Sequence, residues 1–211
     1  MHDPRFITVT LVRHAPTIYP KGTLPPVDPD VDLTDQAQIT RLAQRLPDQA
    51  EWWISPLSRC RKTAEALIEA GATPASQAID PQLVEQDYGE WHGQSVAAIW
   101  DAVKDGPKSN WHFLHASVTP PGGESFNDLC ARLEAVMTRI METKADELVL
   151  IAHGMVIRAL IGLALGKTPG EALAMDVAPL SMSQLTFIAS NDSPDDDAGG
   201  RWMINRLNSG G

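Results

Sequence analysis

Strand-like and helix-like segments alternate along most of this chain, and that alternation limits the folds available to it. The apolar segments FITVTLV (6–12), EWWIS (51–55) and ELVLIA (147–152) have the length and composition of buried strands. Segments with helical spacing of apolar residues lie between and after them. Because alternating strands and helices build a mainly parallel sheet covered by helices, we expect a single α/β domain over residues 1–211.

The remaining elements are assigned from turn residues and apolar spacing. The proline-rich stretch 15–32 is expected to be a loop, and Thr34 is expected to cap the helix that follows it. Further helices are expected over 58–71, 126–144 and 155–166, a weak strand over 75–80, and a closing hairpin from 181–190 and 201–207 around the acidic, mobile loop 191–200. Residues 94–117 interrupt the alternation with short helical pieces, so this segment is the candidate for a small helical lid.

Composition narrows the class of partner. The formal net charge is −10 and the pI is about 4.9, which disfavours nucleic acid and anionic membranes as partners. No apolar run approaches the ~18 residues of a membrane span, and the first residues lack the pattern of a signal peptide. Cys60 and Cys130 do not make a disulfide framework, so a cytoplasmic location is the simplest expectation.

Charged and nucleophilic side chains follow the ends of three expected strands. Arg13 and His14 follow the first strand, Arg59 follows the second, and His153 follows the strand at 147–152. Ligands of open α/β sheets bind beyond the carboxyl ends of the strands, where these side chains would converge. The arginine fork matches phosphate oxygens, and histidine can attack phosphorus as a nucleophile. Each residue alone could equally be a surface or capping residue, so the joint pattern carries the interpretation.

Five motifs in order make this chain resemble the histidine phosphatase superfamily, also called the phosphoglycerate mutase-like family. They are LVRHAPT, SPLSRCRKTAEAL, LVEQDYGEWHG, GGESFNDL and LVLIAHGMVIRAL, which span residues 6 to about 165. The resemblance implies a three-layer α/β/α sandwich with a mostly parallel central sheet, and a phosphohistidine intermediate. By motif position, His14 resembles the nucleophile and Glu85 the proton donor and acceptor. Arg13, Arg59 and His153 resemble the phosphate pocket, with His153 expected to be protonated.

Several positions depart from the family pattern. Ala15-Pro16 replaces the usual Gly-Glu after the histidine, whereas Thr17 matches the usual Thr or Ser, and its hydroxyl is a candidate phosphate contact. His92 stands where the family has a glutamate and is expected to be exposed. The GGES motif is expected to cap the helix that begins near Ser125, with no direct substrate role for Glu124. Arg61 and Lys62 are expected on the solvent face of their helix.

The departures favour the phosphatase branch, which includes α-ribazole phosphatase and broad-specificity monoester phosphatases. Mutases carry Arg-His after the catalytic glutamate, where this chain has Gln86-Asp87, and a long basic insertion, where residues 94–117 are more aromatic than basic. We expect hydrolysis of a small phosphate monoester, such as α-ribazole 5′-phosphate, with no cofactor. No metal is expected, because His112 and His115 have no accompanying metal-ligand motif. Mutase-type phosphotransfer, or phospho-ligand binding without catalysis, stays open, as does a homodimer paired through the closing hairpin.

Overall fold

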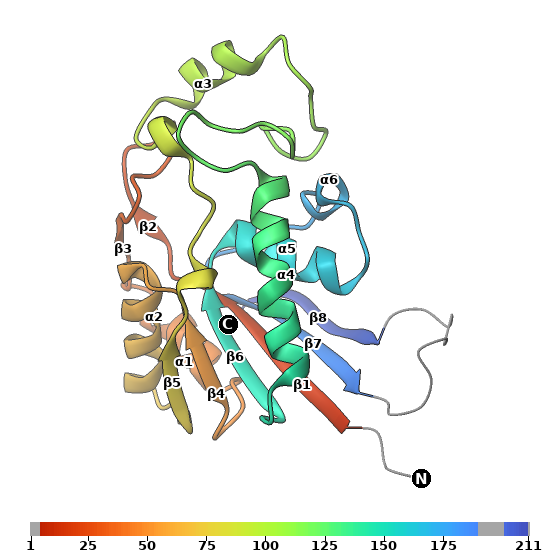
Figure 1. Ribbon diagram of the computed structural model, residues 1–211. Helices are drawn as coiled ribbons and strands as arrows, with labels where there is room; N and C mark the ends of the chain where they lie inside the picture. The colour runs from red at the N-terminus through yellow and green to blue at the C-terminus, as the bar shows by residue number, and fades with distance from the viewer. Residues whose placement is uncertain (1–4, 190–200, 211) are drawn as a thin grey trace.

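The computed structural model describes residues 5–189 and 201–210. Within them a six-stranded sheet runs through the centre, with helices on both faces (Figure 1). The strands are β1 (Arg5–Arg13), β4 (Glu51–Ile54), β5 (Ser76–Ile79), β6 (Glu147–Ala152), β7 (Ser181–Ala189) and β8 (Trp202–Gly210), in the order β5-β4-β6-β1-β7-β8. Strands β5, β4, β6 and β1 are parallel, whereas β7 runs antiparallel to both of its neighbours. The expected three-layer sandwich with a mostly parallel sheet is confirmed.

The alternation of side chains along β1 builds two separate cores. Ile7, Val9 and Leu11 point to one face, where α4 (Phe126–Glu142) and α5 (Gly154–Ala164) cover the sheet. Val12 belongs to the core on the other face, beneath α1 (Gln36–Ala43) and α2 (Ser58–Glu69). Apolar burial on both faces explains why β1 and β6 are almost continuously apolar in sequence. The two free cysteines are divided between these cores, Cys130 in the first and Cys60 in the second.

A third, smaller cluster supports the segment expected to be a lid. Helix α3 (Val96–Val103) lies beyond the carboxyl edge of the sheet (Figure 1). Its Ile99 packs with Leu24, Trp91 and Leu114, far from either face of the sheet. Outside α3, residues 104–117 form turns and bends rather than further helices. Some aromatic side chains of this segment also pack inward, because Phe113 lies against the same cluster, while Trp100 and Trp111 are exposed.

The short elements complete the chain. The proline-rich loop contains the small ladder of β2 (Thr17–Ile18) and β3 (Asp30–Val31). The single-turn helices are η1 (Pro81–Leu83), η2 (Gly89–Trp91) and α6 (Pro169–Ala172). Strands β7 and β8 form the expected closing hairpin, and the acidic loop 191–200 predicted to be mobile lies outside the described residues. Strand β8 is an edge of the sheet, and its pairing with a second copy stays a prediction.

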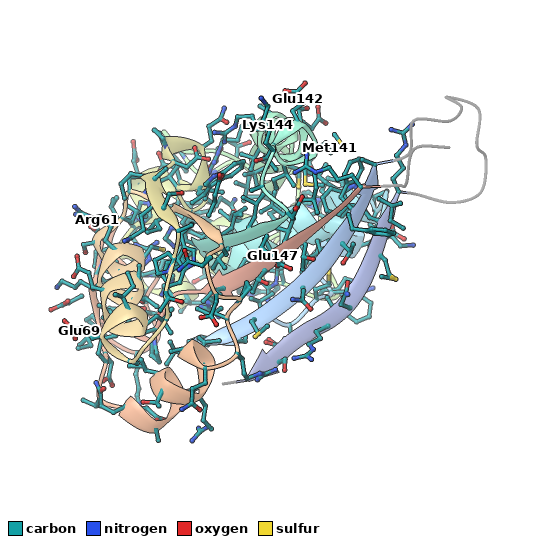
Figure 2. All side chains as sticks on the ribbon, turned by 90° about the horizontal axis from the view of Figure 1, so that it is seen from below. Arg61, Glu69, Met141, Glu142, Lys144 and Glu147 are labelled. Carbon is teal, nitrogen blue, oxygen red and sulfur yellow. The ribbon has the colours of Figure 1, made fainter. Side chains whose placement is uncertain are left out.

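Helix boundaries follow the capping side chains. Ser125 begins α4 with a reciprocal capping box to Asp128, as the GGES motif predicted. The predicted cap at Thr34 is wrong: Asp35 caps α1 by accepting from the Gln38 amide, because the Thr34 hydroxyl is already engaged with Asp32. Figure 2 shows Arg61 on the outer side of α2, away from the sheet, as expected for an exposed residue.

Candidate active site

Parallel neighbours bring two histidines to the same edge of the sheet. Strands β1 and β6 pair in register up to Arg13 and Ala152, so His14 and His153 come next on adjacent strands. The His14 amide donates to the Ala152 carbonyl at 3.0 Å, which fixes the backbone at this point. The two imidazole ring centres lie 5.1 Å apart. The convergence predicted from the strand ends is therefore present in the structure.

The tautomer of His14 follows from its backbone contact. Its Nδ1 lies 2.6 Å from the Ala15 carbonyl oxygen. Because a carbonyl oxygen only accepts, Nδ1 carries the hydrogen and Nε2 keeps its lone pair. Burial, with added repulsion from the Arg59 guanidinium, lowers the pKa of His14 to about 3. His14 is thus a neutral imidazole, and its Nε2 lone pair is turned away from the Ala15 carbonyl and accepts from Arg59.

Arg59 reaches both histidines from the first turn of α2. It is only 5% exposed, and its Nε donates to His14 Nε2 at 3.2 Å and to His153 Nδ1 at 3.1 Å. Nη1 donates to the Val27 carbonyl at 2.9 Å and lies 3.5 Å from an Asp28 oxygen. These contacts hold the guanidinium between the two imidazoles and the proline-rich loop.

His153 lies deeper than His14 and is fully buried. Burial and the positive charge of Arg59 hold the pKa of His153 well below the usual range, so the ring is neutral in the ligand-free protein. Its protonation beside a bound phosphoryl group stays a prediction. Nδ1 accepts from Arg59, and Nε2 lies 2.7 Å from the Ser55 hydroxyl at the end of β4. Both ring nitrogens therefore have partners within the protein.

Arg13 is the last residue of β1 and directly precedes His14. Its Nη1 donates to the Val177 carbonyl at 2.5 Å, whereas its buried Nε has no hydrogen-bond partner. Burial lowers the pKa of Arg13 from its ordinary value, and the nearby Glu85 carboxylate opposes that shift.

Glu85 lies where the chain crosses from η1 to η2. One carboxylate oxygen accepts from the Gln86 amide at 3.0 Å, and the other is 3.4 Å from the Met155 amide in the first turn of α5. Amide groups at a helix N-terminus favour a nearby carboxylate. Gly123 lets this segment pack closely, because a Cβ at Gly123 would lie 2.4 Å from the Asp87 carbonyl oxygen.

A cavity of about 310 Å³, here called the rim cavity, opens above these residues. His14, Arg13, Arg59, Glu85 and Thr17 all line it, so five of the six predicted site residues share one space, and His153 lies directly beneath. His112 and Phe113, from the segment expected to be a lid, form its far wall. Burial lowers the pKa of His112 to about 4, with a further contribution from Arg158.

Arg158 also lines the rim cavity, and sequence reasoning did not single it out. It lies one helical turn after Gly154 on α5, with Nε donating to the Met175 carbonyl at 2.6 Å. The available signal was its spacing: residues four apart share a helix face, so Arg158 lies on the same side as the N-terminus of α5.

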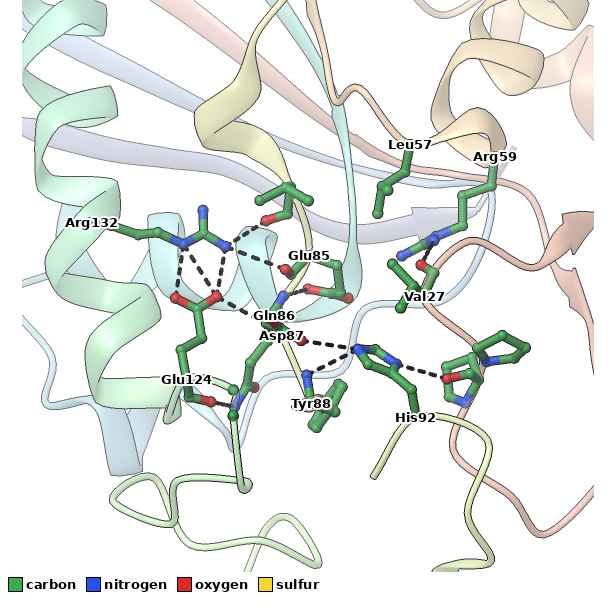
Figure 3. A pocket seen from close by; sticks show the side chains of 15 residues that line it. Val27, Leu57, Arg59, Glu85, Gln86, Asp87, Tyr88, His92, Glu124 and Arg132 are labelled. Atoms are coloured by element: carbon green, nitrogen blue, oxygen red, sulfur yellow. Dashed lines mark hydrogen bonds and ion pairs between the residues drawn. The ribbon is translucent and has the colours of Figure 1, made fainter. Parts of the chain in front are cut away.

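A second cavity of about 460 Å³, here called the side cavity, adjoins the first. Val27, Leu57 and Arg59 form one side, and Gln86, Glu124 and Arg132 form the other (Figure 3). Glu124 pairs with Arg132 at 2.9 Å and accepts from the Asp87 amide at 3.2 Å, so it holds the wall together. His92 is part-buried in this wall rather than exposed as expected, with Nδ1 donating to the Pro25 carbonyl and Nε2 accepting from the Tyr88 amide.

Two properties of the described residues bear on ligands and membranes. Nowhere in residues 5–189 and 201–210 do three or more His, Cys, Asp or Glu side chains come together as metal ligands. Among the helices in that same part of the chain, none has the length and hydropathy needed to cross a membrane.

Relatives and solved structures resemble this chain to different extents. A bifunctional protein of Mycobacterium tuberculosis is 35% identical over 134 residues, which cover 62% of this chain and 35% of that protein, so the chain spans about a third of this longer relative. A 2,3-bisphosphoglycerate-dependent phosphoglycerate mutase of Mesorhizobium japonicum is 30% identical over 182 residues, covering 81% of this chain and 87% of the mutase. The solved structure of a mycobacterial glucosyl-3-phosphoglycerate phosphatase superposes with a TM-score of 0.75 at 25% identity, covering 97% of this chain and all of that one.

The family assignment depends on a match that spans the site and at least part of every strand of the sheet except β8. The sequence profile of branch 1 of the histidine phosphatase superfamily matches residues 9–193. That range contains the histidine pair, both arginines and Glu85. The chain therefore belongs to the histidine phosphatase superfamily.

Proposed function

We propose that this protein hydrolyses small phosphate monoesters through a phosphohistidine formed on His14. The observation that carries the proposal is the orientation of His14. Its Nδ1 hydrogen is held by the Ala15 carbonyl at 2.6 Å, so Nε2 is unprotonated. His14 lines a cavity together with Arg13, Arg59 and Glu85, and a bound phosphoryl group would replace the Arg59 hydrogen bond at Nε2. A neutral nucleophile, two cations and a carboxylate are the groups that phosphoryl transfer through histidine requires.

In the first step, Nε2 of His14 attacks phosphorus and the bond to the leaving oxygen breaks opposite it. Arg13 and Arg59 hold the charge on the three remaining oxygens, and donors fixed in advance supply much of the rate enhancement in such sites. Arg13 lines the rim cavity beside His14, which suits this use. The Thr17 hydroxyl contributes one more contact from the cavity wall.

His153 first serves to hold Arg59. Its Nδ1 accepts from Arg59 at 3.1 Å, and the Ser55 contact at 2.7 Å fixes the ring. A bound phosphoryl group carries negative charge, which favours protonation of a nearby imidazole. His153 then donates to the transferring group after the substrate has bound.

Glu85 gives its proton to the leaving oxygen. In the second step it takes a proton from the water that attacks phosphorus, while the bond from phosphorus to His14 Nε2 breaks and releases inorganic phosphate. The carboxylate belongs to the cavity wall and is not hydrogen-bonded to either histidine. A group in that position reaches the leaving oxygen without competing for the nucleophile. Acid–base assistance of this kind is worth about 10²–10⁴ in rate.

Phosphotransfer to another metabolite is the second candidate, and the similarity to phosphoglycerate mutase over 87% of that protein favours it. A mutase must bind a carboxylate beside the reacting phosphate. This chain has Gln86 and Asp87 directly after Glu85, and Asp87 is itself anionic. Water is therefore the acceptor that we assign, and incubation with phosphoglycerates and bisphosphoglycerate would detect isomerisation instead.

Glu85→Gln tests the proton donor through the leaving group. Glutamine keeps the shape but carries no acidic proton, so release of an alkyl alcohol in the first turnover should slow by about 10²–10⁴. Release of p-nitrophenol should slow far less, because nitrophenolate leaves without a proton. Stopped-flow and rapid-quench measurements of the first turnover isolate this step, since the second step needs the base with either substrate.

The expected signature is a burst of p-nitrophenol and a slow, burst-free release of the alkyl alcohol. Equal slowing for both esters would assign Glu85 to substrate positioning. The proton donor would then have to be sought among other groups of the cavity walls, beginning with His92.

A further inference from the structure

The rim cavity and the side cavity share part of their lining. Arg59, Glu85 and Tyr88 line both of them, whereas His14 lines only the rim cavity. In an in-line displacement the leaving oxygen lies on the far side of phosphorus from the nucleophile. A space that includes the proton donor but excludes the nucleophile therefore lies on the leaving-group side.

We infer that the side cavity binds the alcohol part of the substrate, and that it selects an uncharged, hydroxylated alcohol over one with a carboxylate. The inference rests on the proposed function. It goes beyond that function by naming a binding site and the class of alcohol.

Charge in the side cavity opposes an anionic group. Every nitrogen of Arg132 already donates within the protein: Nε to Glu124, Nη1 to the Gln82 carbonyl and Nη2 to the Val84 carbonyl. Figure 3 shows the bonds of this guanidinium to Glu124 on the same wall. Arg59 is directed to the histidines and the proline-rich loop.

The acceptors of the side cavity remain available to a ligand. Asp87 is at the mouth, with its side chain 59% exposed, and only one of its oxygens accepts from the Gly89 amide at 2.8 Å. A carboxylate with a free oxygen accepts from hydroxyl groups and repels a second carboxylate. The remaining polar chemistry of this space therefore fits hydroxyl donors.

The apolar wall fits the body of such an alcohol. Val27 and Leu57 line one side of the cavity, opposite Gln86 (Figure 3), and Pro26 and Val84 add further apolar lining. The side cavity is also larger than the rim cavity, about 460 against 310 Å³. One apolar and one polar wall suit a ring or chain with hydroxyl groups along one edge, such as a sugar or polyol.

Two matched esters test the charge preference. Glycerol 3-phosphate and 3-phosphoglycerate differ by a hydroxymethyl group in place of a carboxylate. The wild-type protein should have the higher kcat/KM for glycerol 3-phosphate, and Asp87→Asn should reduce that preference by about fivefold, the Coulomb effect of one charge a few ångströms away in a hydrated site. Asparagine keeps an oxygen for the Gly89 amide. Glu90→Gln removes a neighbouring exposed carboxylate outside both cavities and should leave the preference unchanged.

Filling the side cavity tests the location. Val27→Trp and Leu57→Trp each add bulk to the apolar wall, and Ile18→Trp adds the same bulk on an exposed position outside both cavities. Exchange of ¹⁸O between inorganic phosphate and water uses the same chemistry with water as the leaving group, so it needs no alcohol site. The ratio of glucose 6-phosphate hydrolysis to ¹⁸O exchange should fall at least tenfold in the two wall variants and stay constant in Ile18→Trp.

The outcomes separate the inference from the proposed function. Absence of both ester hydrolysis and ¹⁸O exchange in the wild-type protein would remove the proposed function itself. Exchange and hydrolysis that keep a constant ratio in both wall variants would overturn the inference alone. The inference would also be overturned if the ratio of hydrolysis to ¹⁸O exchange fell in Phe113→Trp but not in the two wall variants. That result would put the alcohol in the rim cavity, next to residues 94–117.

Discussion

Acid should destabilise this protein through His14, and His14→Asn should remove that part of the acid sensitivity. His14 is 4% exposed, and its pKa falls from an ordinary 6.5 to about 3 in the folded protein. Below pH 6.5 the unfolded chain takes up a proton at His14, whereas the folded protein does not until about pH 3. The unfolded state is thereby favoured as the pH falls, and stability is retained above the ordinary pKa.

The size of this loss of stability follows from the interval between the pH of the assay and the ordinary pKa of histidine. At pH 5 the unfolded histidine is about 1.5 pH units below its pKa, and each unit corresponds to about 1.4 kcal/mol, so His14 costs about 2 kcal/mol of unfolding free energy relative to pH 8. His153 is also buried with a lowered pKa and adds its own loss. Because burial and Arg59 are the larger causes of the lowered pKa of His153 and stay in place in the variant, most of the difference between wild type and variant belongs to His14.

Urea unfolding at pH 8 and pH 5 measures the effect. Asparagine has a side-chain NH₂ near the position of Nδ1, so the donor to Ala15 is kept and any cavity cost is the same at both pH values. The loss of unfolding free energy between pH 8 and pH 5 should be about 2 kcal/mol smaller in His14→Asn. An identical loss in the two proteins would refute a neutral, buried His14.

Two further substitutions test the arrangement of the site. Arg59→Ala should lower kcat for ester hydrolysis by about 10²–10³, the usual cost of one transition-state donor. Arg61→Ala, on the outer side of α2, should keep a kcat near that of wild type, and equal losses of kcat in the two variants would contradict the assignment of the helix face. Gly123→Ala should destabilise the protein and lower kcat/KM together, because its Cβ would lie 2.4 Å from the Asp87 carbonyl oxygen, and a melting temperature equal to that of wild type would contradict the close packing.

The sheet and the meeting of its strand ends could be predicted because both depend on local patterns. The apolar runs at 6–12 and 147–152 are long enough to identify buried strands, and parallel strands bring their carboxyl ends to one edge. That is why Arg13, His14 and His153 converge as expected. The capping of α4 by Ser125 is equally local.

Features that depend on how deeply a side chain is buried, or on contacts between segments far apart in the chain, could not be predicted from the sequence. The neutral state of His153 follows from complete burial beside Arg59, which the sequence does not record. The side cavity requires Arg132 of α4 to close against the carbonyl of Val84. Glu85 lies between two single-turn helices with no periodic pattern, so only the family resemblance identified it.

Covalent labelling of His14 tests the central proposal most directly. Wild-type protein mixed with a phosphate monoester and quenched in alkali, which preserves phosphohistidine, should carry a phosphoryl group on His14 when peptides are mapped by mass spectrometry. His14→Asn should carry none and should not turn over the ester. A phosphoryl group on any other residue, or continued turnover by the wild-type protein with no covalent label at all, would contradict the proposed mechanism.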